Sequence, residues 1–121
     1  MITENVRLIL KDEEKFFGPG IAALLHLIDE HGSIQAACAV MEMSYSKAWK
    51  IIKRADQTLG FPLLDSKNGG RDGGKSALTE QGRKFLACYD RMDAQLGEAA
   101  KRLLQENFAE FLEQEAARKQ G

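Results

Sequence analysis

Residues 33–60 read SIQAACAVMEMSYSKAWKIIKRADQTLG, and this stretch decides the fold. Ser33 can cap a short helix, and a second, longer helix is expected over Tyr45–Leu59, where a glycine follows and favours helix termination. Only Glu42-Met43-Ser44 separates the two helices. Because so short a link makes two helices cross steeply, the pattern predicts a helix-turn-helix.

The longer helix has one apolar face and one basic face. The apolar face consists of Ala48, Ile51, Ile52, Ala55 and Leu59, and the basic face of Lys47, Lys50, Arg54 and Gln57, with Lys53 at its edge. Lys47 stands in the first turn, where the macrodipole disfavours a cation by about 0.3–1 kcal/mol, and an external phosphate would offset that cost. A solvated basic face is the alternative. The position directly after a capped short helix favours nucleic acid, with Tyr45 and Ser46 at the end that enters a major groove.

Three side chains in apolar helical patterns, one tryptophan and two cysteines, are expected inside the protein. Trp49 lies between the two faces of the longer helix, so we expect it to pack against the neighbouring helix with its indole N–H near the surface, and direct contact with phosphate is the alternative. Cys38 and Cys88 lie far apart in apolar patterns, which favours two buried free thiols over a disulfide. Free thiols are typical of the cytoplasm.

The segment before the helix-turn-helix predicts a strand and a helix. Residues 6–10 alternate loosely and indicate a short strand, and the charged residues 11–15 indicate a connection. A helix is expected to start at Pro19, where a proline does no harm, and to stop at His31-Gly32.

The glycine-rich octet GGRDGGKS at 69–76 permits two interpretations. It satisfies G-x-x-x-x-G-K-[ST], the phosphate-cradling loop of nucleotide-hydrolysing enzymes. Such a loop needs a helix that begins at Lys75, whereas the next helix start is signalled at Thr79. We therefore interpret the octet as the tip of a β wing between strands at 61–65 and 76–78, and we expect no enzyme; a merely disordered loop is the alternative. The wing cations that face phosphates are Lys67, Arg71 and Lys75.

The long helix from residue 79 carries a heptad seam. Its members are spaced alternately four and three residues apart and are Phe85, Tyr89, Met92, Leu96, Ala99 and Leu103. The seam runs past what a small domain needs for its own core, which predicts dimerisation through this helix. Near Asn107 the phase of the apolar spacing shifts, and residues 104–112 carry a separate apolar cluster. Residues 114–121 are expected to fray.

Charge is distributed unevenly along the 121 residues, whose formal net charge is −1. Residues 1–43 carry three basic against seven acidic side chains, residues 44–84 nine against four, and residues 85–121 five against seven. A basic centre between acidic flanks can direct its field toward a polyanion. No apolar run approaches the roughly 20 residues of a membrane-spanning helix, and no secretory signal is visible, so we expect a cytoplasmic location and no membrane partner.

The chain resembles the N-terminal DNA-binding domain of ModE-type molybdate-responsive transcriptional regulators. The resemblance is carried by Gly32-Ser33-Ile34, by Ser44-Tyr45-Ser46-Lys47-Ala48-Trp49, by the double glycines at 69–70 and 73–74, and by Leu78-Thr79 with Gly82. The broader pattern, with Gly60 and Leu63, is similar to LysR-type regulators. The resemblance covers about residues 5–105. One departure is Glu42, where the helix-turn-helix pattern often favours glycine.

The resemblance implies a bacterial, cytoplasmic homodimer that binds a palindromic operator in double-stranded DNA. With the patterns above, it places the DNA contacts at Ser33, Tyr45, Ser46, Lys47, Lys50, Arg54, Lys67, Arg71 and Lys75. Full ModE proteins continue into oxyanion-binding domains, and nothing in this sequence resembles them. We therefore expect neither a cofactor nor molybdate binding by this chain.

The sequence thus predicts a mainly α fold with a small β wing. A winged helix-turn-helix is expected over residues 1–78, with its recognition helix at 45–59 and its wing at 63–78, followed by a long C-terminal dimerisation helix at 79–113 and a tail at 114–121. The predicted function is sequence-specific binding of double-stranded DNA by a dimeric transcriptional regulator. The alternative is a protein–protein adaptor that keeps the fold and recruits partners through its C-terminal helix.

Overall fold

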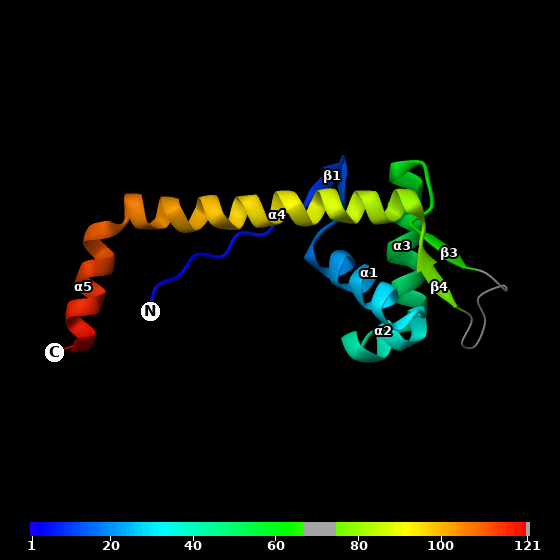
Figure 1. Cartoon of the computed structure of the whole chain (residues 1–121), viewed down its shortest axis with the longest axis horizontal. Helices are drawn as coiled ribbons and strands as arrows, with labels where there is room; N and C mark the ends of the chain where they lie inside the picture. Colours follow the sequence, from blue (N-terminus) through cyan, green and yellow to red (C-terminus); the bar gives the residue numbers. More distant parts are fainter. Residues whose placement is uncertain (67–74, 121) are drawn as a thin grey trace. The chain divides into compact units, whose positions relative to one another are not determined.

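The computed structural model describes residues 1–66 and 75–120, and Figure 1 shows the order of its elements. Contacts group Leu8–Tyr89 into one compact unit and Met1–Arg7 with Asp90–Gly121 into another. The division falls inside α4 (Glu80–Asn107), so the first turns of this helix belong to the unit that holds the helix-turn-helix. That unit therefore extends beyond the boundary predicted at residue 78.

A short antiparallel hairpin precedes the first helix and consists of β1 (Leu10–Asp12) and β2 (Glu14–Phe17). The strand predicted at residues 6–10 is wrong over most of its length. Leu8 is buried and its carbonyl accepts a hydrogen bond from Tyr89 Oη at 2.8 Å, so core contacts hold this segment in place of strand pairing. The charged residues 11–15, predicted as a connection, form most of the hairpin.

α1 (Pro19–His31) forms as predicted, with a proline at its start. Gly32 ends it in the left-handed conformation with a φ of 76°, and the Gly32 N–H donates to Ile28 O at 2.7 Å. Leu24, Leu25 and Ile28 are almost completely buried. The predicted apolar face of this helix therefore lines the core.

The helix-turn-helix consists of α2 (Ile34–Met41) and α3 (Tyr45–Leu59), with the predicted bounds. A serine caps each helix: Ser33 Oγ accepts the Ala36 N–H at 2.9 Å, and Ser44 Oγ accepts the Lys47 N–H at 3.1 Å. Each cap satisfies a backbone donor that the first turn of a helix leaves without an intrahelical partner. Local capping chemistry thus sets where both helices begin.

Glu42, in the turn between the two helices, has a φ of 55° and a ψ of 45°. This left-handed conformation costs a residue with a Cβ about 1 kcal/mol relative to glycine. We expect Glu42→Gly to raise the free energy of unfolding in urea by about that amount. Glu42→Ala removes the same carboxylate but keeps the Cβ, so it should bring no such gain; equal stabilisation by both variants would trace the effect to charge and not to backbone conformation.

β3 (Leu64–Ser66) and β4 (Ser76–Leu78) pair in antiparallel fashion and form the predicted hairpin, although its first strand begins at Leu64 and not at the predicted residue 61. The Ser76 N–H donates to Gly32 O at 2.9 Å, which fastens β4 to the end of α1. Residues 67–74, between the strands, lie outside the described residues. The base of the wing is therefore anchored beside the turn that leads into the helix-turn-helix.

α4 begins directly after Thr79, where the sequence predicts a helix start. The Thr79 hydroxyl donates to Pro62 O at 2.7 Å and accepts the Gly82 N–H at 2.9 Å. The Thr79 N–H donates to Leu63 O at 2.9 Å, and Leu63 is fully buried. One threonine thus caps α4 and joins it to the segment before the wing.

Aromatic rings of β2 and α4 pack together in the core of the Leu8–Tyr89 unit. The Phe17 ring centroid lies 4.8 Å from that of Phe85 and 4.9 Å from that of Tyr89, and Tyr89 is only 4% exposed. Both α4 rings therefore serve the core of their own unit, which corrects their assignment to the dimerisation seam. The hairpin supplies Phe17 as their partner, and the sequence pattern of the helix alone does not reveal it.

In the other unit, α4 ends at Asn107 and α5 (Ala109–Gln120) follows. The single helix predicted over residues 79–113 is therefore divided in two, at the place where the sequence predicts a phase shift. The predicted fraying is wrong up to residue 120, because these residues are helical. Glu115 accepts the Ile2 N–H at 3.1 Å and lies 3.3 Å from the Met1 amine. These contacts, the Ile2 hydrogen bond above all, lower the pKa of the Glu115 carboxyl.

The two cysteines differ in their surroundings. Cys38 is buried as predicted, and burial raises the pKa of its thiol. Cys88 is exposed, contrary to the prediction, because its neighbours Leu86 and Tyr89 take the inward positions on this turn of α4. Among the described residues, no helix is both long enough and apolar enough to cross a membrane.

Candidate nucleic-acid interface

α3 presents its N-terminal turn and its basic face to solvent. The predicted contact residues exposed on it are Tyr45, Ser46, Lys47 and Lys50. On the opposite face Ala48, Ile52 and Ala55 are almost completely buried. The predicted division of this helix into an apolar and a basic face is therefore confirmed, and the cations are available to a partner outside the protein.

Two further predicted contact residues already interact within the protein. The Arg54 guanidinium forms an ion pair with Glu14 of β2, and both side chains are more than half exposed. Such exposed pairs contribute only about 0–1 kcal/mol, so a phosphate can replace Glu14. The Ser33 hydroxyl accepts the capping hydrogen bond of α2, but its proton remains able to donate to an anion.

Lys75 is the wing cation that the structure describes. It is exposed and directly precedes Ser76, whose N–H bonds to Gly32 O, so it lies close to the start of α2. Lys67 and Arg71 lie outside the described residues. The wing therefore brings one predicted cation toward the helix-turn-helix.

The end of the glycine-rich octet leads into a strand and not into a helix. Ser76 is the first residue of β4, and the next helix begins at Glu80. A phosphate-cradling loop needs the N-terminus of a helix at this place, where backbone N–H groups and the dipole converge on the anion. Elsewhere, residues 1–66 and 75–120 contain no group of three or more His, Cys, Asp or Glu side chains suited to hold a metal ion.

Trp49 lies on the exposed side of α3, which corrects the prediction that it packs against the neighbouring helix. Its side chain is 39% exposed, and its ring stacks on that of Tyr45 with centroids 6.5 Å apart and planes within 8°. The Lys53 Nζ lies 4.4 Å from the Trp49 ring centroid. Ala48, Ile52 and Ala55 occupy the buried face of the helix. The spacing of four residues from Tyr45 is the signal that could have revealed this pairing.

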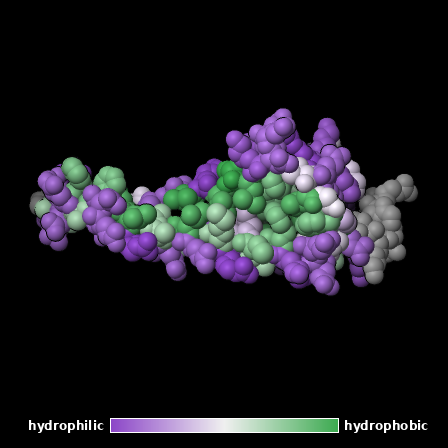
Figure 2. Space-filling view, turned by 90° about the horizontal axis from the view of Figure 1, so that it is seen from above, coloured by the Kyte–Doolittle hydropathy of each residue, from purple (hydrophilic) through white to green (hydrophobic). Residues whose placement is uncertain are grey.

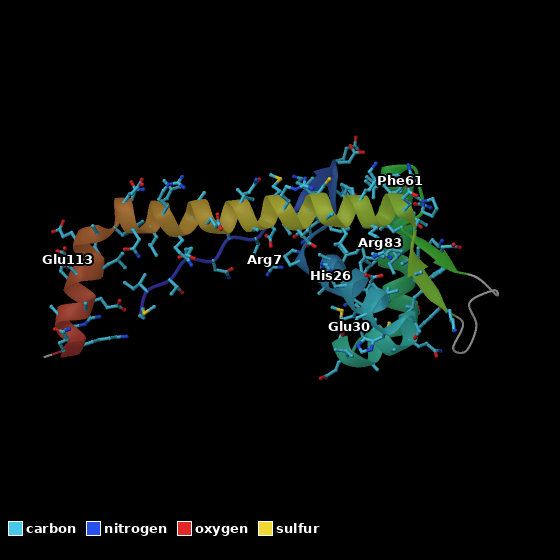
Figure 3. The ribbon with its side chains drawn as sticks, viewed as in Figure 1. Arg7, His26, Glu30, Phe61, Arg83 and Glu113 are labelled. Carbon is cyan, nitrogen blue, oxygen red and sulfur yellow. The ribbon has the colours of Figure 1, made fainter. Side chains whose placement is uncertain are left out.

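A bidentate ion pair that no sequence pattern predicts joins α4 to α1. Arg83 Nη1 and Nη2 each lie 3.0 Å from a carboxylate oxygen of Asp29. Figure 3 shows Arg83 on the side of α4 that faces α1, the helix that carries His26 and Glu30. The two partners are far apart in the sequence, and no spacing rule connects them. The pair links α1 to the start of α4 within their unit.

The hydrogen bonds from Arg83 lower the pKa of the Asp29 carboxyl. We expect the Asp29 carboxyl carbon, followed by NMR, to titrate below its ordinary range and to return toward that range in Arg83→Gln. Because the folded-state pKa is lowered, the pair stabilises the fold above the unfolded-state pKa, and this stabilisation is lost as the pH falls through the folded-state pKa. Arg91→Gln, a control on the same helix, should leave the Asp29 titration unchanged; an unchanged titration in Arg83→Gln would contradict the assignment.

The arrangement of α1, the α2–α3 pair, the β3–β4 hairpin and the following helix defines a winged helix-turn-helix, the fold class that the sequence predicts. The family model of the bacterial regulatory helix-turn-helix proteins of the lysR family matches residues 22–83. The chain belongs to this family.

Two similar proteins support the resemblance to ModE-type regulators. The molybdenum transport protein ModE of Azotobacter vinelandii is 36% identical over 80 residues, which are 66% of this chain and 30% of that protein. The transcriptional regulator ModE of Haemophilus influenzae is 32% identical over 91 residues, 75% of this chain and 36% of the relative. The chain thus spans about a third of the length of these relatives.

A solved structure supports the fold. ArgP from Mycobacterium tuberculosis is similar to this chain with a TM-score of 0.53 at 25% sequence identity, over 73% of this chain and 31% of ArgP. The similarity again covers most of this chain and less than a third of the other.

Proposed function

We propose that this chain binds a specific sequence of double-stranded DNA as a homodimer and thereby regulates transcription. The observation that carries the proposal is the exposed N-terminal half of α3, where Ser46, Lys47 and Lys50 stand on a helix whose other face is buried. In helix-turn-helix proteins the N-terminal residues of the second helix meet the base edges in the major groove. The ModE regulators to which the chain is similar support the same assignment.

The wing adds contacts to the DNA backbone in this proposal. Lys75 is exposed at the base of the β3–β4 hairpin, close to the start of α2. Lys67 and Arg71 add two cations to the same loop in the sequence. Cations on such a hairpin bind phosphates and release counterions, so they strengthen binding without reading the sequence.

Gel retardation with a random-sequence duplex tests the proposal at its simplest level. We expect a retarded complex at 50 mM salt, and an affinity about a thousandfold lower at 200 mM if some six phosphates are neutralised. Absence of any complex at 50 mM salt would contradict DNA binding.

The remaining seam residues of α4 support a dimer. Met92 and Leu103 are each 47% exposed, and Leu96 and Ala99 are half-buried in their unit. Figure 2 shows hydrophobic side chains gathered along α4. A heptad-spaced apolar seam of this kind buries itself against a second helix, and a two-fold dimer matches a palindromic operator.

Leu103→Asp is expected to convert the dimer to a monomer. Light scattering should then give the mass of one 13.5 kDa chain in place of two, because an aspartate in the seam would be buried against its symmetry copy. Gln105→Asp introduces the same charge at an exposed neighbouring position and should leave the dimer intact. A monomeric wild-type chain at micromolar concentration would contradict the assigned dimer seam.

The adaptor alternative rests on a different surface. Phe108 and Phe111 are 51% and 57% exposed, with ring centroids 6.4 Å apart. In our proposal the double substitution of both by alanine leaves duplex affinity unchanged. The adaptor function would be favoured if the wild-type chain binds no duplex and the double variant loses a protein partner that the wild type binds.

We further propose that residues 1–121 act by binding in the cytoplasm and not by catalysis. No molybdate binding is assigned to them. Isothermal titration with molybdate and with ATP should accordingly give no binding heat, and saturable binding of either would contradict this part of the proposal.

A further inference from the structure

Two aromatic rings lie stacked on the exposed side of α3, next to the polar residues assigned to DNA contact. Tyr45 and Trp49 are 38% and 39% exposed, and their planes lie within 8° of each other. Tyr45 is the first residue of the helix, and Trp49 lies one turn further along. We call Tyr45 and Trp49 the aromatic pair.

The aromatic pair is ordered before any partner arrives. The i, i+4 spacing holds the two rings together on one side of the helix. The Lys53 Nζ lies 4.4 Å from the Trp49 ring centroid, in the geometry of a cation–π interaction, and 3.5 Å from the Asp56 carboxylate. Because rings fixed in this way lose little freedom on binding, they can supply contact area at low entropic cost.

The position of the aromatic pair determines what it can meet. Each ring has a polar neighbour in the sequence, since Ser46 follows Tyr45 and Lys50 follows Trp49. All four residues are exposed on the first turns of the helix. When those turns enter a major groove, polar side chains meet hydrogen-bonding base edges. The apolar groups that the major groove offers are the 5-methyl groups of thymine.

We propose that the aromatic pair contacts thymine 5-methyl groups and so determines base specificity, while the lysines of α3 bind phosphates. This inference rests on the proposed function. It assigns to Trp49 a role in sequence recognition, and it requires thymine at one or more positions of each half-site.

Replacing thymine by deoxyuridine tests the inference, since the exchange removes only the methyl group. With the full chain and a duplex selected by the wild type, each contacted methyl should contribute about fourfold to the affinity, as expected for one buried carbon. In Trp49→Ala, deoxyuridine at the position contacted by the indole should change the affinity less than 1.5-fold. Val40→Ala, which shortens an exposed apolar side chain of α2, should keep the wild-type response.

Trp49 is the only tryptophan of the chain, so its fluorescence gives a second readout. Binding of the selected duplex should protect it from acrylamide quenching, and the all-deoxyuridine duplex at equal saturation should protect it less. Unchanged random-duplex affinity in Trp49→Ala shows that the variant is folded.

Three outcomes would overturn the inference. If the wild type binds its selected duplex with no response to deoxyuridine at any position, or if the full response persists in Trp49→Ala and in Tyr45→Ala, the methyl contact is refuted while DNA binding stands. Failure of the wild type to bind any duplex refutes the proposed function together with this inference.

Discussion

The double variant Lys47→Ala/Lys50→Ala is expected to bind its selected duplex roughly a hundredfold more weakly than the wild type. Both lysines are exposed on the face of α3 assigned to DNA. Each should form a charge-assisted hydrogen bond to phosphate, a class of interaction that contributes about 1.5 kcal/mol or more. Each also releases about one counterion, so the slope of log affinity against log salt should fall in magnitude by about 2.

A control variant separates local contact from net charge. Lys11→Ala/Lys101→Ala removes the same two charges from exposed positions outside α3. It should leave the salt slope unchanged and alter the affinity only a fewfold through the long-range field. Equal losses in both double variants would show that net charge, and not the face of α3, governs binding.

Gly82→Ala is expected to destabilise the winged helix-turn-helix by about 3 kcal/mol in urea unfolding. A Cβ at this position would lie 2.4 Å from Leu63 O and 3.0 Å from Thr79 Oγ1. The Leu63 carbonyl also accepts the Thr79 N–H, so the start of α4 would have to move away from its anchor. Overpacking of this kind costs about 1–3 kcal/mol, and weakened hydrogen bonds add to it.

The same substitution elsewhere in α4 provides the control. A Cβ at Gly97 meets nothing within 4 Å, so Gly97→Ala should raise stability by up to about 1 kcal/mol through helix propensity. The two variants should therefore shift the urea midpoint in opposite directions. A Gly82→Ala protein as stable as the wild type would contradict the close approach of α4 to Leu63.

The elements that the sequence predicts correctly are those with local causes. The hydroxyl oxygens of Ser33 and Ser44 cap their helices by accepting the backbone N–H of the residue three positions further along the chain. Gly32 and Gly60 end helices in the left-handed conformation that glycine adopts without strain. These signals lie within a few residues of the structure they specify, so α1, α2 and α3 have the bounds predicted for them.

The errors concern residues whose environment depends on distant segments. Tyr89 fits a heptad seam by spacing, but its hydroxyl donates to Leu8 O and its ring packs on Phe17. The Arg83–Asp29 pair likewise joins two helices that are far apart in the sequence. Helical periodicity identifies an apolar face, but it does not distinguish a domain core from a dimer partner.

Trp49 illustrates the same limit at the candidate site. Its position between the two faces of α3 is compatible with burial and with exposure. The general preference of tryptophan for packing favours burial, whereas the structure shows the ring on the exposed side. The outcome depends on how much of the buried face the smaller residues Ala48, Ile52 and Ala55 already fill. The exposure of the lysines on α3 is easier to predict, since a cation is almost never buried without a partner.

Selection of bound sequences from a random duplex pool tests the central claim, sequence-specific DNA binding through α3, most directly. We expect enrichment of a palindromic site whose half-sites lie one helical turn, about 10 base pairs, or a multiple of it apart. We also expect nanomolar affinity for that site, and about a hundredfold weaker binding to it by Lys47→Ala/Lys50→Ala. A pool that stays random after repeated rounds with the wild-type chain would contradict the claim.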